Sequence, residues 1–258
     1  QRTAQALLGD SCVIVPEKTA MIGEDFSFFN AGSGAMDDFA GGAPWDDYRS
    51  SITTVIFTGG VTYVGAYAFR NCDSLVSIFI PANTTNIHRD SFMHCNSLLS
   101  IDVDRANTAY SSHDGTLYNK EMTTLICCPG GTPGTFLIPA TVDYVMNAFD
   151  GCYSLTDIQV EKGNQHYSSK NGILYNYAGY TLIRCPLGKR GSLSLPDNTV
   201  AINPLSFEDC CYLTNIFLPD GVRRIGTGWF KNCTPLTRVH LPDTVTEIEQ
   251  MVFNGCSS

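Results

Sequence analysis

Apolar positions along the chain recur in short alternating runs, and turn residues separate the runs. Between Ile52 and Phe57 apolar and polar residues alternate as in a β-strand, and Gly59-Gly60 then interrupts the run. The next alternating run ends at Pro81, which cannot donate to a sheet ladder. Between these runs, the apolar segment 66–69 is long enough for one helical turn only. The pattern therefore predicts short strands joined by tight turns.

The same pattern returns at a fixed period, with a phenylalanine and a cysteine at constant positions. The phenylalanines are Phe69, Phe92, Phe149, Phe207, Phe230 and Phe253, and the cysteines, each three residues later, are Cys72, Cys95, Cys152, Cys210, Cys233 and Cys256. Where no insertion intervenes, successive phenylalanines are 23 residues apart. A fixed period in this range is typical of a solenoid, in which each coil packs on its neighbours. We therefore expect these two columns to lie in the core.

Two insertions that resemble each other interrupt the period, at about 107–133 and about 164–190. Asp114-Gly115 and Asn171-Gly172 are hairpin turn signals between strand-like flanks. Each insertion is therefore predicted to contain a β-hairpin. We expect the strand that returns from each hairpin, which ends in proline, to rejoin the main sheet of the solenoid.

The first 50 residues lack the repeat, and we expect them to form an N-terminal β cap over the open end of a solenoid that spans 51–258. A solenoid end exposes apolar core unless it is covered. Trp45 and Tyr48 are the predicted lid, and a sugar-binding aromatic platform is the alternative. The chain begins without methionine, as a mature or trimmed chain does, and stops where a further strand is due. We therefore expect a longer natural protein.

The 11 cysteines follow the repeat more closely than they follow any disulfide framework. We favour a column of small, buried, free thiols. Stacked disulfides are the alternative, because neighbouring coils are about 4.8 Å apart. Zinc is less favoured because no Cys-x-x-Cys occurs and the pairs Cys127-Cys128 and Cys210-Cys211 point to opposite strand faces.

Charge and hydropathy exclude two classes of partner. Charged residues make up 16% of the chain and the net charge is −9, so a basic surface for nucleic acid has no support. No run of about 18 apolar residues exists, so we expect no membrane span.

Catalysis also has little support, and we expect no catalytic residues, metal or cofactor. The histidines are scattered and no nucleophile, zinc or phosphate motif occurs. His113-Asp114 is better explained as part of a hairpin turn. The acidic pairs Asp37-Asp38 and Asp46-Asp47 lack the spacing of a calcium loop, which favours a solvated acidic face.

Residues that alternate with the buried anchors of each strand face outwards on the sheet side of the solenoid. This surface mixes apolar and polar groups, as protein interfaces do, and the alternative is a plain solvated face. The candidate binding residues are Ile56, Phe79, Asp102, Leu137, Asp157, Gln159, Asn215, Phe217, Arg238 and His240.

The repeat resembles the BspA-like leucine-rich repeats, over about 51–258. The matching positions of one unit are Leu213-x-x-Ile216-x-Leu218-Pro219, Val222-x-x-Ile225, Phe230-x-x-Cys233 and Leu236. The resemblance implies a β-rich α/β leucine-rich repeat solenoid, with a parallel sheet on one face and short helical turns on the other. Gly32-x-Gly-Ala-Met36 and Pro44-Trp45 are similar to the segment that precedes such repeats in secreted members. Trp229 and Val252 depart from the family pattern, since small residues occupy their position elsewhere, and this indicates altered packing in the last coils.

The resemblance implies a non-catalytic, secreted or cell-surface bacterial protein that adheres to a protein of a host or neighbouring cell. A second hypothesis is a carbohydrate-binding module of a larger secreted protein, with Trp45, Tyr48, Tyr110 and Tyr167 as platforms. A third is a scaffold domain without a ligand of its own.

Overall fold

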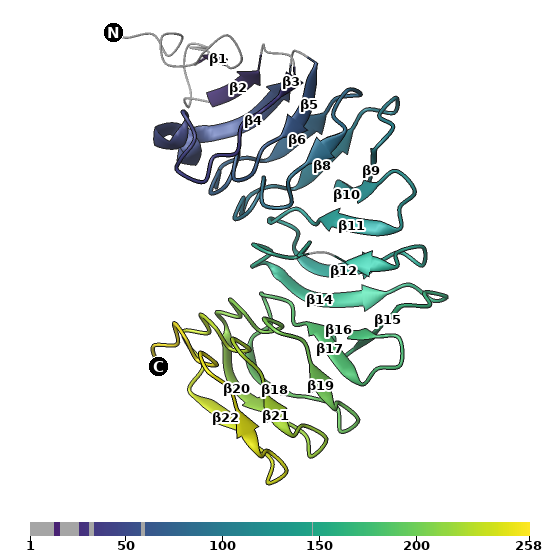
Figure 1. Cartoon of the computed structure of the whole chain (residues 1–258), viewed down its shortest axis with the longest axis vertical. Coiled ribbons are helices and arrows are strands. Elements are labelled where there is room, and N and C mark those ends of the chain that lie inside the picture. The colour runs from purple at the N-terminus through teal and green to yellow at the C-terminus, as the bar shows by residue number, and fades with distance from the viewer. Residues whose placement is uncertain (1–12, 16–25, 31–33, 58–59, 146) are drawn as a thin grey trace. The chain divides into compact units, whose positions relative to one another are not determined.

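The structure, a computed structural model, describes residues 13–15, 26–30, 34–57, 60–145 and 147–258 (Figure 1). These residues wind as a β-solenoid, which confirms the predicted fold. They contain no α-helix, and the one helical element is the short 3-10 helix η2 (Asp46–Ser51). The described fold is therefore almost entirely strand and turn.

Each regular coil has a main strand, a turn after it, a short second strand and a series of tight turns. In one such coil β6 (Ser77–Ile80) is the main strand and β7 (Asn86–Ile87) is the second strand. Where the sequence predicted one helical turn, at 66–69, the chain forms successive tight turns. Each turn is closed by a backbone hydrogen bond between residues three positions apart, such as that from Cys72 N–H to the Phe69 carbonyl at 3.2 Å. A coil of this size has no room for more than successive turns.

By their contacts the residues form two compact units. Unit 1 is 1–132 with 144–152, and unit 2 is 133–143 with 153–258. The division of the chain into a cap at 1–50 and a solenoid at 51–258 stays a prediction.

Unit 1 holds two parallel ladders and the first hairpin. The main sheet has the order β1-β2-β4-β6-β8, the second strands pair as β3-β5-β7, and a third sheet has the order β13-β11-β10-β9. The strands are β1 (Val13–Val15), β2 (Phe26–Asn30), β3 (Gly34–Ala35), β4 (Ile52–Phe57), β5 (Val61–Val64), β6, β7, β8 (Ser100–Val103), β9 (Tyr110–His113), β10 (Thr116–Asn119), β11 (Thr124–Cys127) and β13 (Tyr144–Val145).

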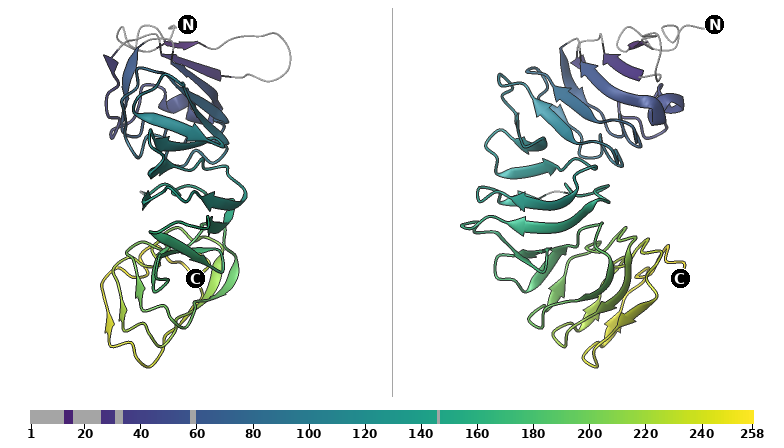
Figure 2. Two further views of the ribbon diagram at one scale, coloured as in Figure 1. Left: turned by 90° about the vertical axis from the view of Figure 1, so that its right-hand side faces the viewer. Right: turned by 180° about the vertical axis from the view of Figure 1, so that it is seen from behind.

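Unit 2 repeats this plan. Its sheets have the orders β12-β14, β15-β16-β17-β19, β18-β20-β22 and β21-β23. The strands are β12 (Gly134–Ile138), β14 (Leu155–Val160), β15 (Tyr167–Lys170), β16 (Ile173–Asn176), β17 (Thr181–Arg184), β18 (Gly191–Ser194), β19 (Ala201–Ile202), β20 (Leu213–Phe217), β21 (Arg224–Ile225), β22 (Arg238–His240) and β23 (Glu247–Ile248). The stacking of β18, β20 and β22 can be followed in Figures 1 and 2.

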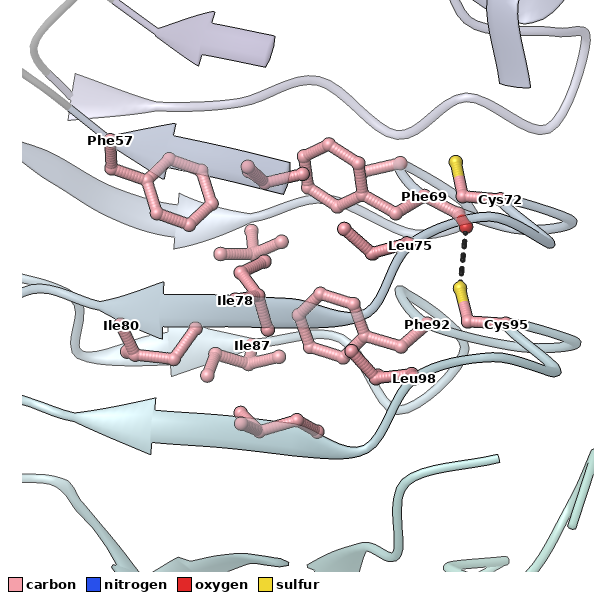
Figure 3. Close-up of a cluster of buried hydrophobic side chains, with 14 of the residues drawn as sticks. Phe57, Phe69, Cys72, Leu75, Ile78, Ile80, Ile87, Phe92, Cys95 and Leu98 are labelled. Carbon is pink, nitrogen blue, oxygen red and sulfur yellow. Dashed lines mark hydrogen bonds between the residues drawn. The ribbon is translucent and has the colours of Figure 1, made fainter. Parts of the chain in front are cut away.

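The phenylalanine column lies in the core as predicted. Phe69 and Phe92 are buried and stack with ring centroids 6.0 Å apart (Figure 3). In unit 2 the Phe207 and Phe230 rings are in contact, with centroids 5.4 Å apart and an interplanar angle of 35°. Rings at one repeat position meet because the backbone ladder holds successive coils at the spacing of paired strands.

The cysteine column also confirms the prediction of buried thiols, and the structure shows why a thiol recurs there. The Cys95 thiol donates to the Phe69 carbonyl of the preceding coil at 2.9 Å (Figure 3), and Cys233 repeats this with Phe207 at 3.0 Å. The side chain is small enough for the turn and still satisfies a buried carbonyl. The ten cysteines that the structure describes are free thiols.

Both predicted hairpins are present, with turns at Asp114-Gly115 and Asn171-Gly172. All four turn residues have positive φ, as the tightest hairpin turns require. Gly115 also lies against β8, since a Cβ added to it would be 2.9 Å from the Leu99 carbonyl oxygen.

The expectation that the return strands rejoin the main sheet is wrong. β11 pairs in parallel with β13, and β17 pairs in parallel with β19, and both partners are second strands. The reason is that each hairpin takes the place beside the main strand: Ile101 N–H of β8 donates to the Gly115 carbonyl at 2.7 Å, and Ile158 N–H of β14 donates to Gly172 at 2.8 Å. Each return strand therefore pairs with its own hairpin on one side and with the second strand of the next coil on the other.

The described residues before the first regular repeat, 26–30 and 34–51, form an irregular coil of their own. β2 extends the main sheet beside β4, and β3 extends the second ladder beside β5. Trp45 takes the place of the core phenylalanine: it is fully buried, stacks on Phe69 at 5.9 Å, and its indole N–H donates to the Ala68 carbonyl at 2.8 Å. The lid prediction is confirmed for Trp45, whereas Tyr48 is 41% exposed.

Replacing a column phenylalanine should destabilise the protein strongly. Phe69→Ala removes a fully buried ring that packs between Trp45 and Phe92. We expect it to lower the free energy of unfolding by about 3–5 kcal/mol, measured by urea denaturation. The matched control is Phe79→Ala, whose ring is 48% exposed, with an expected cost below about 1 kcal/mol. Equal costs for the two variants would contradict the core assignment.

Burial of the thiol column should make stability fall in alkaline solution. Burial raises the pKa of the Cys72 thiol to about 12 and raises the pKa of Cys95 well above its ordinary value. The folded protein therefore keeps protons that the unfolded chain releases above about pH 9, so stability is full below pH 9 and is lost towards pH 12.

We expect urea midpoints to decrease between pH 8 and pH 10.5, and to decrease less in the Cys72→Ala/Cys95→Ala variant. A midpoint that stays constant or rises over this range would show that the thiols are not held protonated by the fold.

Candidate binding surface

The outward face of the main strands follows from period-two alternation. In β6 the side chains of Ile78 and Ile80 are buried, and Phe79 between them is 48% exposed. Parallel pairing carries this pattern to the neighbouring coils, because Phe79 is in register with Asp102 and Ser77 is in register with Ser100. Successive coils therefore present one outward row.

In unit 1 this row brings together Ile56, Phe79 and Asp102, as the sequence predicted. Ile56 is 39% exposed and lies beside Phe79, one step beyond the aligned pair Val55 and Ile78. The Asp102 carboxylate accepts from the Ser100 hydroxyl at 2.8 Å.

Two further exposed apolar residues beside these strands were not predicted from the sequence. Val76 and Leu99 directly precede the main strands, are 45% and 55% exposed, and are adjacent because Leu99 N–H donates to the Val76 carbonyl at 2.8 Å. They follow the buried anchors Leu75 and Leu98, and an apolar residue straight after each anchor was the available signal. We call Ile56, Val76, Phe79 and Leu99 the apolar sheet patch.

On β12 and β14 of unit 2 the candidates are Leu137, Gln159 and Asp157. Leu137 is exposed and in register with Gln159. The two polar side chains serve the adjacent hairpin: Asp157 accepts from the Lys189 ammonium at 3.0 Å, and Gln159 accepts from the Ser169 hydroxyl at 2.9 Å. These polar groups already have partners inside the protein.

On β20 and β22 the remaining four candidates form two cross-strand pairs. Phe217 and His240 are in register, and their rings stack with centroids 3.9 Å apart and an interplanar angle of 6°. Asn215 is in register with the exposed Arg238 and donates to the Ser192 hydroxyl at 3.0 Å. The sequence-predicted residues thus form one group in unit 1 and two groups in unit 2.

Most of the aromatic residues that the carbohydrate hypothesis proposed as sugar-binding platforms are buried or partly buried in the protein. Trp45 is buried in the core, and Tyr110 is buried with its hydroxyl accepting the Ile87 N–H at 2.9 Å. Tyr167 is partly buried, and its hydroxyl donates to the Asp143 carbonyl at 3.2 Å. A sugar ring needs an open aromatic face, and of the four residues only Tyr48 is exposed.

One residue of each acidic pair near the N-terminus, Asp38 and Asp46, accepts hydrogen bonds from the backbone. The Asp38 carboxylate accepts the Ala66 N–H and the Tyr63 hydroxyl, both at 2.7 Å, and these bonds lower the pKa of Asp38. Asp46 accepts the Ala43 N–H at 2.9 Å and pairs with Arg49. Asp38 thus ties the irregular first coil to the solenoid, whereas Asp46 makes its bonds within that coil.

The described part of the chain offers few groups of side chains arranged for catalysis or metal binding. His113 and Asp114 lie 3.6 Å apart on an exposed hairpin turn, as the turn signal predicted. No group of three or more His, Cys, Asp or Glu residues there is placed to hold a metal ion. Nor is any helix among these residues long and apolar enough to cross a membrane.

A family model described as "BspA type Leucine rich repeat region" matches residues 47–130 and 185–258 in six copies. Among solved structures, the pneumococcal vaccine antigen PcpA is 18% identical to this chain and has a TM-score of 0.51. The matched region covers 92% of this chain and 70% of the PcpA chain. A leucine rich cell surface protein from Faecalibacterium prausnitzii is 21% identical, with coverages of 96% and 79% and a TM-score of 0.46. At these identities the likeness concerns the fold alone. No curated protein matches the chain.

Proposed function

Since the chain belongs to the BspA-type leucine-rich repeat family, we propose that it is a non-catalytic bacterial repeat protein that binds another extracellular protein through its main sheet. The observation that carries this proposal is the apolar sheet patch of unit 1. Four exposed apolar side chains lie on, or directly before, the main strands of three adjacent coils, and exposed apolar residues gathered in this way mark interaction sites.

The chemistry of the patch suits a protein partner. Phe79 supplies an aromatic side chain, and aromatic residues are enriched at the energetic centres of interfaces. Asp102 and the serines of the neighbouring row supply a polar rim around it. An apolar centre with a polar rim is the usual anatomy of a protein interface.

The scaffold under the patch favours affinity. The strands that carry Ile56, Phe79 and Asp102 are paired to one another in one parallel sheet, so little backbone freedom is left to lose on binding. The corresponding place in unit 2 is less open, because the Phe217 ring is already stacked on His240. We therefore assign the main contact to unit 1.

We place the protein at the cell surface or outside the cell, with a protein of a host or neighbouring cell as its partner. Family membership supports this placement, and one of the similar structures is titled a vaccine antigen. The carbohydrate hypothesis is not carried forward, because the indole ring on which it most depended is buried.

Removing the aromatic centre of the patch should weaken binding strongly without unfolding the protein. We expect Phe79→Ala to weaken binding to its partner by about tenfold or more, measured by surface plasmon resonance against a panel of purified extracellular-matrix proteins. The matched control is Tyr144→Ala, because Tyr144 is a similarly exposed aromatic residue on a second strand of the same unit, and this variant should leave binding unchanged. If no panel member binds, or if the two variants bind equally, the proposal fails.

A further inference from the structure

The ladder of second strands is broken at one place in unit 2. β17 pairs with β19 and β21 pairs with β23, but among the described residues β19 and β21 are not paired. The main strands of the same two coils remain paired, with Leu193 in register with Ile216. The two coils therefore meet on the main-sheet side and at Gly221, where an added Cβ would lie 2.6 Å from the Thr199 carbonyl oxygen, and they separate beyond it, between β19 and β21.

The intact ladders show which bonds the break removes. Elsewhere, successive second strands are joined by His88 N–H to Val64 at 2.9 Å, and by Glu249 N–H to Ile225 at 3.0 Å. At the equivalent place in the described chain, no backbone bond joins 200–202 to 223–226. Pairing of the two coils resumes at Asp209, whose N–H donates to the Lys231 carbonyl at 3.0 Å.

The side chain of Trp229 explains the break. Apart from Val252, the equivalent residues of the other coils are Ala or Ser, and in one of them the Ser91 hydroxyl donates to the Gly65 carbonyl of the preceding coil at 2.9 Å. This position thus lies directly against the neighbouring second strand. Trp229 is only 4% exposed and lines the same pocket as Ala201 and Ile202 of β19, so its indole lies beside the preceding second strand. An added Cβ on Gly226 would lie 2.4 Å from the indole nitrogen, so only glycine leaves room for the ring here.

The opened ladder forms a groove of about 870 Å³, a volume within the usual range for ligand sites. Ile202 and Trp229 are its buried apolar lining. Val200, Ala201 and Arg223 line it as exposed residues. Its lining carries two cations, Arg223 and Arg224, and two carboxylates, Asp220 and Glu249, so its formal charges balance, and Arg224 pairs with Glu249.

We propose that this groove binds an extended, uncharged peptide segment of another protein, which pairs its backbone with the open edges of β19 and β21. Two strand edges that lack their usual partners offer N–H and C=O groups along one line, and an extended chain is the ligand that satisfies such a line. The compensated charges disfavour an anionic ligand, and the apolar lining favours small branched side chains. This site lies on a different strand row from the apolar sheet patch and does not depend on it.

The test uses NMR spectroscopy of the isotope-labelled chain with a small library of capped hexapeptides that alternate valine or isoleucine with threonine. We expect at least one peptide at about 1 mM to shift the amide signals of 200–202 and 223–227. The same peptide with alternate amides N-methylated should not shift them, because it lacks the donors for strand pairing. No response to any peptide, or an equal response to the methylated form, would overturn the proposal.

Substitutions in the groove test whether the peptide binds at this site. Trp229→Ser restores the small residue, and we expect the ladder to close and peptide binding to be lost. If this variant does not fold, Ala201→Tyr fills the exposed lip of the groove without changing the core, and should weaken binding at least tenfold. The matched control, Asn86→Tyr, places the same ring at the same repeat position in unit 1, where the ladder is intact, and should bind as the natural chain does. Peptide binding that is unchanged by Ala201→Tyr would contradict the assignment. Phe79→Ala, which alters the apolar sheet patch, should leave peptide binding unchanged.

Discussion

The structure depends on the backbone hydrogen bonds between parallel strands of successive coils. These bonds fix the spacing of the coils at that of paired strands, so every side-chain column must hold residues whose size fits that spacing. Flat rings such as Phe69 and Phe92 stack at this distance, and a cysteine fits under each turn while its thiol reaches the carbonyl of the coil before. The sequence repeats because every coil must satisfy the same spacing.

The same constraint explains both candidate sites. Where the ladder is intact, side chains at one repeat position are presented side by side, and four apolar residues on neighbouring coils then form a single patch. Where one column residue is too large, as at Trp229, the ladder opens locally and leaves strand edges exposed. At Val252, by contrast, the smaller branched side chain is accommodated, because Phe230 N–H still donates to its carbonyl at 3.0 Å.

Much of the fold could be predicted because periodicity reports packing directly. The phenylalanine and cysteine columns, the hairpin turns at Asp114-Gly115 and Asn171-Gly172, and the outward position of Phe79 all follow from local patterns. The path of the return strands could not be predicted, because it depends on which place beside β8 the hairpin itself occupies. The outward position of Val76 was also missed, because strand alternation does not continue through the residue next to the Leu75 anchor. The irregular coil around Trp45 lacks the repeat spacing, so only its contacts show that it belongs to the ladder.

The most direct test of this account is amide hydrogen exchange, residue by residue, in the unmodified chain. If coil spacing is set by the ladder and side-chain size decides where the ladder holds, the amides of His88, Thr246 and Glu249 should exchange slowly. Those of Arg223 and Gly226, at equivalent places beside Trp229, should exchange at least a hundredfold faster. Equal protection at all five positions would show that the large side chain does not separate the coils, and would contradict the account.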